Sequence, residues 1–265
     1  ILIFFVTLSK FLSRLAGSRD EHNPFTLREQ IQSMVQMPPQ EGGDIQAIEK
    51  TMIRRMFNFS ETTVYNVMVP LIDVNAIEKH CTKMIAKLWN APGETIGTST
   101  IGSSEACMLA GLAFKRRWQH DRKAKGLPTD KPNLIMSSAV QVVWEKFCNY
   151  WEVEPRYVPI TLDEPNLTPE GMLAAIDENT IGVVGILGVT YTGSYEPIKE
   201  LAAALDDLQE RTGRDVPLHV DAASGGMVAP FLQPDLEWDF RLTRVHSINT
   251  SGHKYGLVYP GLGWV

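Results

Sequence analysis

The chain has 265 residues, of which 44% are apolar and 21% are charged, a composition that is typical of globular proteins and excludes disordered and collagen-like chains. Its net charge of −6 argues against an electrostatic grip on nucleic acid, so no nucleic-acid partner is expected. The three cysteines are too few and too unpatterned for a disulfide framework or a zinc site. We therefore expect a reducing, cytoplasmic location and no metal site.

Residues 1–15 are the part of the chain with a possible membrane association. The run from Ile1 to Leu8 is apolar but shorter than the roughly 20 residues that span a bilayer. Lys10 and Arg14 follow it, as basic residues follow the cytoplasmic end of a membrane helix. Two interpretations stay open: the tail of a membrane helix, which the apolar run favours, or a helix that packs on protein. Because the first residue is Ile rather than Met, we expect the chain to begin within a longer reading frame.

Residues 1–77 are expected to form a helical segment. Apolar residues recur at helical spacing between Ile45 and Met56, which predicts an amphipathic helix, and a short strand is predicted at 74–77. Residues 23–26, 47–57 and 63–74 resemble the membrane-to-CBS linker of the CorC/cyclin-M-type magnesium and cobalt transport proteins. An ordinary helical extension is the alternative.

From residue 78 onward, short apolar runs alternate with amphipathic segments. The runs predict strands at 133–136, 182–187, 218–221 and 245–248, and the segments predict helices at 104–124, 140–151, 169–177 and 197–211. This alternation predicts an α/β domain with a mostly parallel sheet and helices on both of its faces. Residues 261–265 read as the approach to another strand, so we expect the C-terminus to be truncated.

Three separate signals for a ligand site occur in this second part. Ser103 and Ser104 follow Gly102 at the start of a helix, an arrangement that binds phosphate or simply caps the helix. Asp221 ends a buried strand, where a carboxylate meets a cation or closes a turn, and Lys254 follows another strand in a loop of small residues. In this order, the three features match the phosphate, ring-nitrogen and aldehyde anchors of pyridoxal phosphate.

Residues from about 76 to 265 resemble the glutamate decarboxylases, which are fold-type I pyridoxal-phosphate group II decarboxylases. The motifs that carry the resemblance lie at 88–92, 97–109, 128–133, 177–184, 188–193, 219–226, 238–241 and 251–256. The resemblance implies that residues 78–265 form part of a PLP-dependent transferase-like large domain. It also implies decarboxylation of L-glutamate to 4-aminobutyrate and CO₂, and a homodimer or larger oligomer. The alternative is the cytosolic portion of a CorC-type protein that is fused to, or misassembled with, a decarboxylase fragment.

The resemblance also assigns catalytic roles to three residues. Lys254 would form the Schiff base with the cofactor aldehyde, and Asp221 would pair with the pyridinium nitrogen. Lys254 or His253 would return the proton to Cα. The family's C-terminal small domain carries an arginine for the substrate carboxylate and has no counterpart in this sequence, so the chain as given is expected to be a poor catalyst.

The remaining implied roles concern cofactor binding. Ser103 and Ser104 would hold the phosphate, with help from Ser251 and His253. Gln141 would stack on the ring face, and Thr190 would lie near the ring oxygen. Glu145 departs from the family pattern, because many relatives carry His at that point, and this departure bears on the polarity near the ring.

Overall fold

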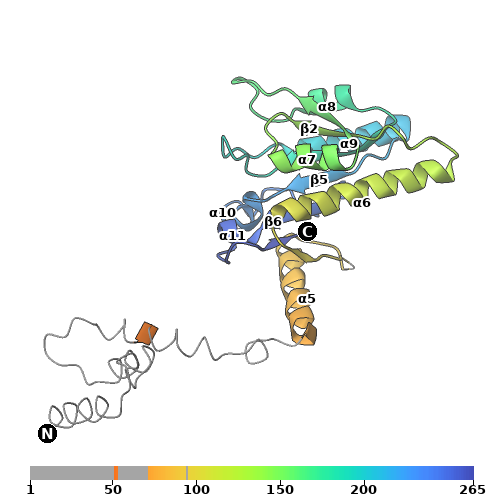
Figure 1. Ribbon diagram of the computed structural model, residues 1–265. Coiled ribbons are helices and arrows are strands. Elements are labelled where there is room, and N and C mark those ends of the chain that lie inside the picture. Colours follow the sequence, from red (N-terminus) through yellow and green to blue (C-terminus); the bar gives the residue numbers. More distant parts are fainter. Residues whose placement is uncertain (1–50, 53–70, 94) are drawn as a thin grey trace, which may run out of the picture. The chain divides into compact units, whose positions relative to one another are not determined.

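A computed structural model describes residues 51–52, 71–93 and 95–265. The contacts between residues divide the chain into two compact units, Ile1–Pro70 and Leu71–Val265. The apolar run at 1–15 and nearly all of the predicted helix at 45–56 lie outside the described residues. The second unit is an α/β domain (Figure 1).

Within the described residues, seven strands form one sheet in the order β1-β7-β6-β5-β4-β2-β3. Strands β2 to β6 run parallel to their neighbours among themselves, whereas β7 is antiparallel to both β6 and β1. The strands are β1 Ser99–Thr100, β2 Asn133–Ser137, β3 Glu154–Val158, β4 Thr180–Ile186, β5 Leu218–Asp221, β6 Val245–Ser251 and β7 Gly263–Trp264. The prediction of a mostly parallel sheet is confirmed, and β2, β4, β5 and β6 coincide with the predicted apolar runs.

Helices pack on both faces of this sheet (Figure 1). They are α6 Ser103–Ala124 and α7 Val142–Tyr150 on one face, and α8 Pro169–Ala175 and α9 Ile198–Thr212 on the other. Because side chains alternate along a strand, Leu134 and Met136 join the apolar cluster under α6 and α7, while Ile135 joins the cluster under α8 and α9. A strand that is buried on both faces has a continuous apolar sequence, which is why β2 was predictable.

The remaining helices are α5 Leu71–Leu88, η1 Gly225–Met227, α10 Ala229–Leu232 and α11 Gly252–Tyr255. The predicted strand at 74–77 is wrong, because these residues belong to α5. Val74 and Ile77 are 45% and 60% exposed and belong to no strand of the sheet. A helix that has formed over the following residues extends easily across them, because adding a residue to an existing helix costs less than starting one. No helix in the described part of the chain is long and apolar enough to cross a membrane.

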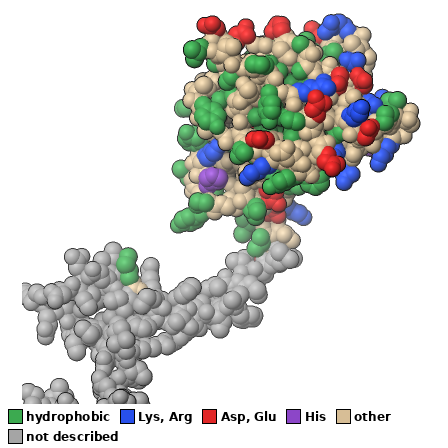
Figure 2. Space-filling model, turned by 45° about the horizontal axis from the view of Figure 1, so that its top comes forward, with side chains coloured by type: hydrophobic (Ala, Val, Ile, Leu, Met, Phe, Trp, Pro, Cys, Tyr) green, Lys and Arg blue, Asp and Glu red, His purple; other side chains and the backbone are tan. Residues whose placement is uncertain are grey.

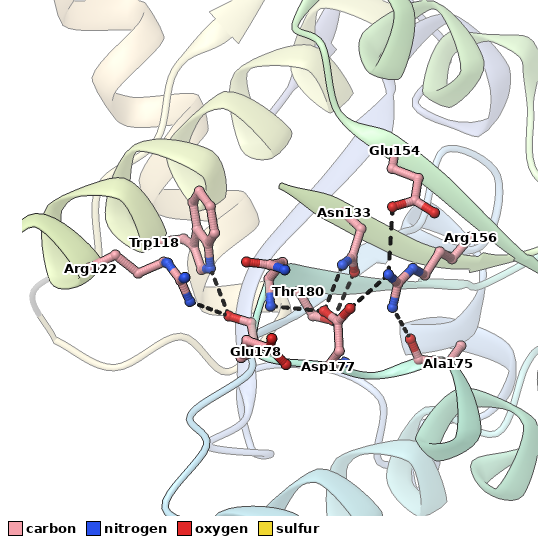
Figure 3. Close-up of polar contacts among 10 residues, drawn as sticks. Trp118, Arg122, Asn133, Glu154, Arg156, Ala175, Asp177, Glu178 and Thr180 are labelled. Carbon is pink, nitrogen blue, oxygen red and sulfur yellow. Dashed lines mark hydrogen bonds and ion pairs between the residues drawn. The ribbon is translucent and has the colours of Figure 1, made fainter. Parts of the chain in front are cut away.

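A polar cluster fixes the edge of the sheet where the parallel strands begin (Figure 3). The carboxylate of Asp177 accepts hydrogen bonds from Asn133 Nδ2 at 2.7 Å and from the backbone N–H of Asn179 at 2.8 Å. It also accepts a charged hydrogen bond of 2.7 Å from Arg156, which donates in addition to the carbonyl of Ala175. These bonds join the loop before β4 to β2 and β3. On the face shown in Figure 2, basic and acidic side chains are interspersed with apolar ones.

Candidate functional site

Asp221 lies at the carboxyl end of β5, in the middle of the sheet, and is only 4% exposed. Its carboxylate accepts hydrogen bonds from Trp144 Nε1 at 2.9 Å, from Asn249 Nδ2 at 3.2 Å and from the backbone N–H of Ala223 at 3.3 Å. The thiol of Cys107 is 3.7 Å from the same group. These donors hold the carboxylate in one orientation at the sheet edge where open α/β folds bind ligands.

Asn249 lies beside Asp221 on the neighbouring strand β6 and is fully buried. Besides Asp221, its Nδ2 contacts the hydroxyl oxygen of Ser103 at 2.6 Å. Its Oδ1 lies 2.8 Å from Nε2 of His219, whose Nδ1 lies 2.7 Å from the hydroxyl of Ser247. A carboxylate only accepts hydrogen bonds, so Nδ2 is the donor and Oδ1 accepts from the ring of His219.

His219 is neutral at physiological pH. Burial lowers the pKa of its imidazole to about 4, although the charge of Asp221 and the hydrogen bond with Asn249 oppose this shift. The ring lies edge-on to Trp144, with 5.1 Å between the ring centroids. Because His219 carries no charge, it does not neutralise Asp221, and the negative charge of that carboxylate is left for a cationic ligand.

Burial also keeps the thiol of Cys107 protonated. Burial, together with the charge and the hydrogen bond of Asp221, raises the pKa of this thiol well above its usual range. Cys107 is 1% exposed, and its sulfur lies 3.7 Å from a carboxylate oxygen of Asp221. Cys107 therefore acts in this structure as a weak hydrogen-bond donor rather than as a nucleophile.

The start of α6 is the candidate anion-binding cradle. Gly102 precedes the helix at φ 152°, a conformation open essentially to glycine alone. A Cβ added at Gly263 of β7 would lie 2.6 Å from the backbone nitrogen of Ser103, so only glycine allows this close approach. Ser103 is half-buried and Ser104 is exposed at the first turn, where the N–H groups have no partner within the helix and the helix dipole favours an anion.

Three other predicted residues lie where β6 ends. Lys254 belongs to α11 and is exposed, and its Nζ donates to the hydroxyl of Ser224 at 3.2 Å. Ser251 is 1% exposed, and its hydroxyl finds no hydrogen-bond partner among the described residues. A buried hydroxyl without a partner is uncommon and costly, but Thr82, Ser137 and Thr250 share this feature, so Ser251 is a candidate because it also lies at the carboxyl end of β6. His253 is exposed on α11.

Gln141 and Thr190 form a separate pair. Gln141 precedes α7, and its Nε2 donates to the hydroxyl of Thr190 at 2.6 Å. Glu145 is exposed on α7 and is among the groups that raise the pKa of Tyr157 on β3, after burial and Cys148. The neighbour of Asp221 on this helix is Trp144 rather than Glu145.

Asn249 thus forms one hydrogen bond with Ser103 and one with Asp221, and so connects these two predicted residues. Another hydrogen bond pairs Gln141 with Thr190. Sequence reasoning missed Asn249 and Trp144. The available signal for Asn249 was a polar residue directly after a predicted apolar strand, within the part of β6 from Ile248 to Ser251 that is buried. Trp144 gave no such signal, because a tryptophan in an amphipathic helix is ordinarily a core residue.

Comparison with known proteins shows the family of the chain. The family model described as the pyridoxal-dependent decarboxylase conserved domain matches residues 59–265. The chain belongs to this family. The pyridoxal-dependent decarboxylases are carboxy-lyases, and their cofactor is pyridoxal 5′-phosphate. The buried carboxylate, the phosphate-type cradle and the unpartnered Ser251 hydroxyl fit this cofactor, which carries a ring nitrogen and a phosphate.

The similar proteins include several glutamate decarboxylases. Glutamate decarboxylase of Aliivibrio fischeri is 53% identical over 218 residues, which are 77% of this chain and 47% of that protein. Glutamate decarboxylase 5 of Arabidopsis thaliana is 57% identical over 193 residues, 71% of this chain and 39% of that protein. The structure of the Lactobacillus brevis glutamate decarboxylase superposes with a TM-score of 0.72 at 38% identity and covers 92% of this chain and 63% of that one. The chain therefore spans less than half the length of these two relatives compared by sequence.

The comparisons do not show the expected likeness of residues 1–77 to CorC-type transport proteins. The match to the decarboxylase family begins at residue 59, inside the segment to which that likeness was assigned. Most of the residues that carried it lie outside the described part of the chain.

Proposed function

We propose that the protein decarboxylates L-glutamate to 4-aminobutyrate and CO₂ with pyridoxal 5′-phosphate as cofactor. The observation that carries the proposal is the buried Asp221 carboxylate at the end of β5, linked through Asn249 to Ser103 in the phosphate-type cradle. The identity of more than half of the aligned residues to named glutamate decarboxylases supports glutamate as the substrate.

Ser103 and Ser104 are proposed to bind the phosphate, together with the N–H groups of the first turn of α6. Because the Ser103 oxygen accepts from Asn249, its own proton is left to donate to an anion. The buried Ser251 hydroxyl lacks a partner among the described residues and is proposed as a further donor, beside His253. Charge-assisted bonds of this kind are roughly twice as strong as neutral ones.

Asp221 is proposed to hold the protonated ring nitrogen. When bound, the cofactor supplies an electron sink for the pair released from the bond between Cα and the carboxylate. A carboxylate that is buried beside the neutral His219 meets little screening by water, so its attraction to a positive ring nitrogen is strong. Gln141 and Thr190, which are hydrogen-bonded to each other, are proposed to contact the ring face and the ring oxygen.

Lys254 is proposed as the residue that attaches to the cofactor aldehyde. As CO₂ leaves, one proton must be added at Cα, and Lys254 or His253 is the proposed donor, since both lie on the short helix α11 beyond β6. The resemblance further supports a cytoplasmic protein that is a homodimer or larger oligomer, a state that sedimentation would test.

Two measurements on the 265-residue chain test this proposal. Release of CO₂ from L-glutamate in the presence of pyridoxal phosphate should exceed release from L-aspartate, which is one methylene shorter. Borohydride reduction followed by peptide mapping should find the cofactor on Lys254. Label on Lys131 or Lys146 instead, or equal release from both amino acids, would contradict the lysine assignment or the substrate assignment, respectively.

A further inference from the structure

The amide of Asn249 touches both ends of the proposed cofactor site. One nitrogen atom, Nδ2, donates to Asp221 Oδ1 at 3.2 Å and to Ser103 Oγ at 2.6 Å. These two residues come from β5 and from the start of α6, and they lie 118 positions apart in the sequence (221 − 103). Because an amide nitrogen carries two N–H donors in one plane, the orientation of this single group sets the direction of both hydrogen bonds.

The orientation of the amide is itself fixed. Its oxygen accepts from Nε2 of His219 at 2.8 Å, and the other ring nitrogen of His219 lies 2.7 Å from Ser247 Oγ. The imidazole is buried and lies edge-on to Trp144 and Phe114. Since Asp221 accepts from the nitrogen, turning the amide over would place its oxygen against the carboxylate oxygen of Asp221.

These contacts join the two halves of the cofactor site. When Ser103 donates its proton to an anion, its oxygen becomes a better acceptor for Asn249, because hydrogen bonds in a chain polarise one another. The same amide holds Asp221 in place for the ring nitrogen. We propose that Asn249 is a positioning residue that couples phosphate binding at Ser103 to the orientation of Asp221. This inference rests on the proposed cofactor site and does not depend on glutamate being the substrate.

The experiment measures cofactor binding in place of turnover. Dissociation constants for pyridoxal phosphate are determined for the 265-residue chain and for Ser103→Ala, Asn249→Leu and the double variant. Asn249→Leu keeps the branching of the side chain and removes both donors. We expect Asn249→Leu to weaken binding roughly ten-fold or more. The effect of Ser103→Ala should fall from about ten-fold in the parent to about three-fold or less once Asn249 is changed, because coupled partners are not additive.

A second readout reports the other end of the site. With pyridoxal phosphate labelled with ¹⁵N in the ring, the nitrogen signal of the bound cofactor in the parent should be that of a protonated ring. In Asn249→Leu it should move part of the way toward the unprotonated position, because Asp221 loses one of the donors that orient it while those from Trp144 and Ala223 remain. A purely structural role for Asn249 would not move this signal at saturating cofactor.

Thr250→Val is the matched control. Thr250 is the next residue on β6, is equally buried, and its hydroxyl has no hydrogen-bond partner in the described part of the chain. This variant should keep both the affinity and the ¹⁵N signal of the parent. Should Asn249→Leu fail to fold, as judged by circular dichroism, Asn249→Ala carries the same test without added bulk.

The outcomes separate this inference from the proposed function. Additive effects of Ser103→Ala and Asn249→Leu, with an unchanged ¹⁵N signal, would overturn the positioning role and leave the proposed function in place. A parent chain that binds no pyridoxal phosphate would overturn the proposed function and this inference with it. Normal coupling together with faster release of CO₂ from another amino acid than from glutamate would support the positioning role and contradict only the proposed substrate.

Discussion

Four hydrogen-bond donors surround Asp221, and replacing this residue should impair decarboxylation more than cofactor binding. Asp221→Ala removes the charge that is proposed to face the ring nitrogen but leaves the cradle at α6 intact. The chain should therefore keep part of its affinity for the cofactor. An opposite charge at short range shifts a pKa by about 1–3 units, so decarboxylation should fall by roughly ten- to thousand-fold. Cofactor absorbance and CO₂ release measure the two effects. Asp163→Ala, at an exposed aspartate, is the control, and near-normal turnover in Asp221→Ala would contradict the role.

His219 should make the stability of the chain depend on pH. Burial lowers the pKa of this imidazole in the folded state to about 4, whereas in the unfolded chain it is about 6.5. Between these values the unfolded state binds more protons, so stability falls as the pH drops from about 6.5 to 4, by up to roughly 3 kcal/mol.

Thermal unfolding of the cofactor-free chain at a series of pH values measures the contribution of His219. His219→Gln retains an N–H donor for Asn249 and removes the titrating group, so its stability should vary less over this pH range. His120→Gln, at an exposed histidine, should retain the slope of the parent. An equal slope in the parent and in His219→Gln would show that His219 is not the source.

A residue of the candidate site could be predicted from the sequence only where its place at the end of a strand is enough to indicate its role. Asp221 and Lys254 were singled out because the first ends, and the second follows, a strand that reads clearly from its apolar run; their roles stay predictions. Asn249 and Trp144 were not, because their importance comes from hydrogen bonds to Asp221 across strands and helices that are distant in sequence. Spacing along the chain does not determine such contacts.

At the scale of elements, Asp177 should control how firmly the loop before β4 is held (Figure 3). Burial opposes ionisation of this carboxyl, but hydrogen bonds from Asn133, Asn179 and Arg156 together lower its pKa. Asp177→Ala leaves the buried amide of Asn133 without this partner, so the free energy of unfolding should fall by about 1–3 kcal/mol. Urea unfolding at pH 7 measures the loss.

The pH dependence of the Asp177 effect has a defined sign. A lowered pKa in the folded state gives stability that is present above the ordinary pKa of about 4 and is lost as the pH falls through the lowered value. The difference between Asp177→Ala and the parent should therefore shrink at low pH. Glu178→Ala is the matched control, because the side chain of Glu178 is exposed and only its carbonyl receives bonds from Trp118 and Arg122. A loss as large as that of Asp177→Ala would contradict the assignment.

Elements were predictable where burial on both faces gives a continuous apolar run, as in β2 and β4. β3 was missed because Glu154–Val158 is an edge strand whose residues are mostly exposed, and its sequence is polar and contains a proline. The apolar residues at 74–77 gave the opposite error, since helix α5 leaves Val74 and Ile77 exposed.

For the whole domain, the sequence predicted parallel strands and helices on both faces, but not the order of the strands. The two-residue strands β1 and β7 close one edge of the sheet through antiparallel pairs and are too short for any periodic pattern. The close approach of Gly263 to the start of α6 depends on this order. The predicted cradle at Gly102, Ser103 and Ser104 therefore also involves Gly263, which lies in the segment 261–265 that was expected to approach a strand and forms β7.

Because the proposed cofactor contacts α6, β5 and α11, its binding should stabilise the domain as a unit. A ligand that binds only the folded state adds about 2.7 kcal/mol at a concentration of 100 times its Kd. For a domain of this size, about 1 kcal/mol raises Tm by roughly 2–4 °C, so saturating pyridoxal phosphate should raise Tm by about 5–10 °C. Calorimetry of the 265-residue chain with and without cofactor measures the shift.

Two comparisons show which contacts produce this stabilisation. Pyridoxal, which lacks the phosphate, should give a smaller rise in Tm at the same concentration, because it does not engage Ser103 and the N–H groups at the start of α6. Lys254→Ala should also reduce the rise, since the link to the aldehyde is lost while the phosphate contacts persist. Equal shifts with pyridoxal and with pyridoxal phosphate would contradict the cradle, because its donors are directed at an anion that only the phosphate provides.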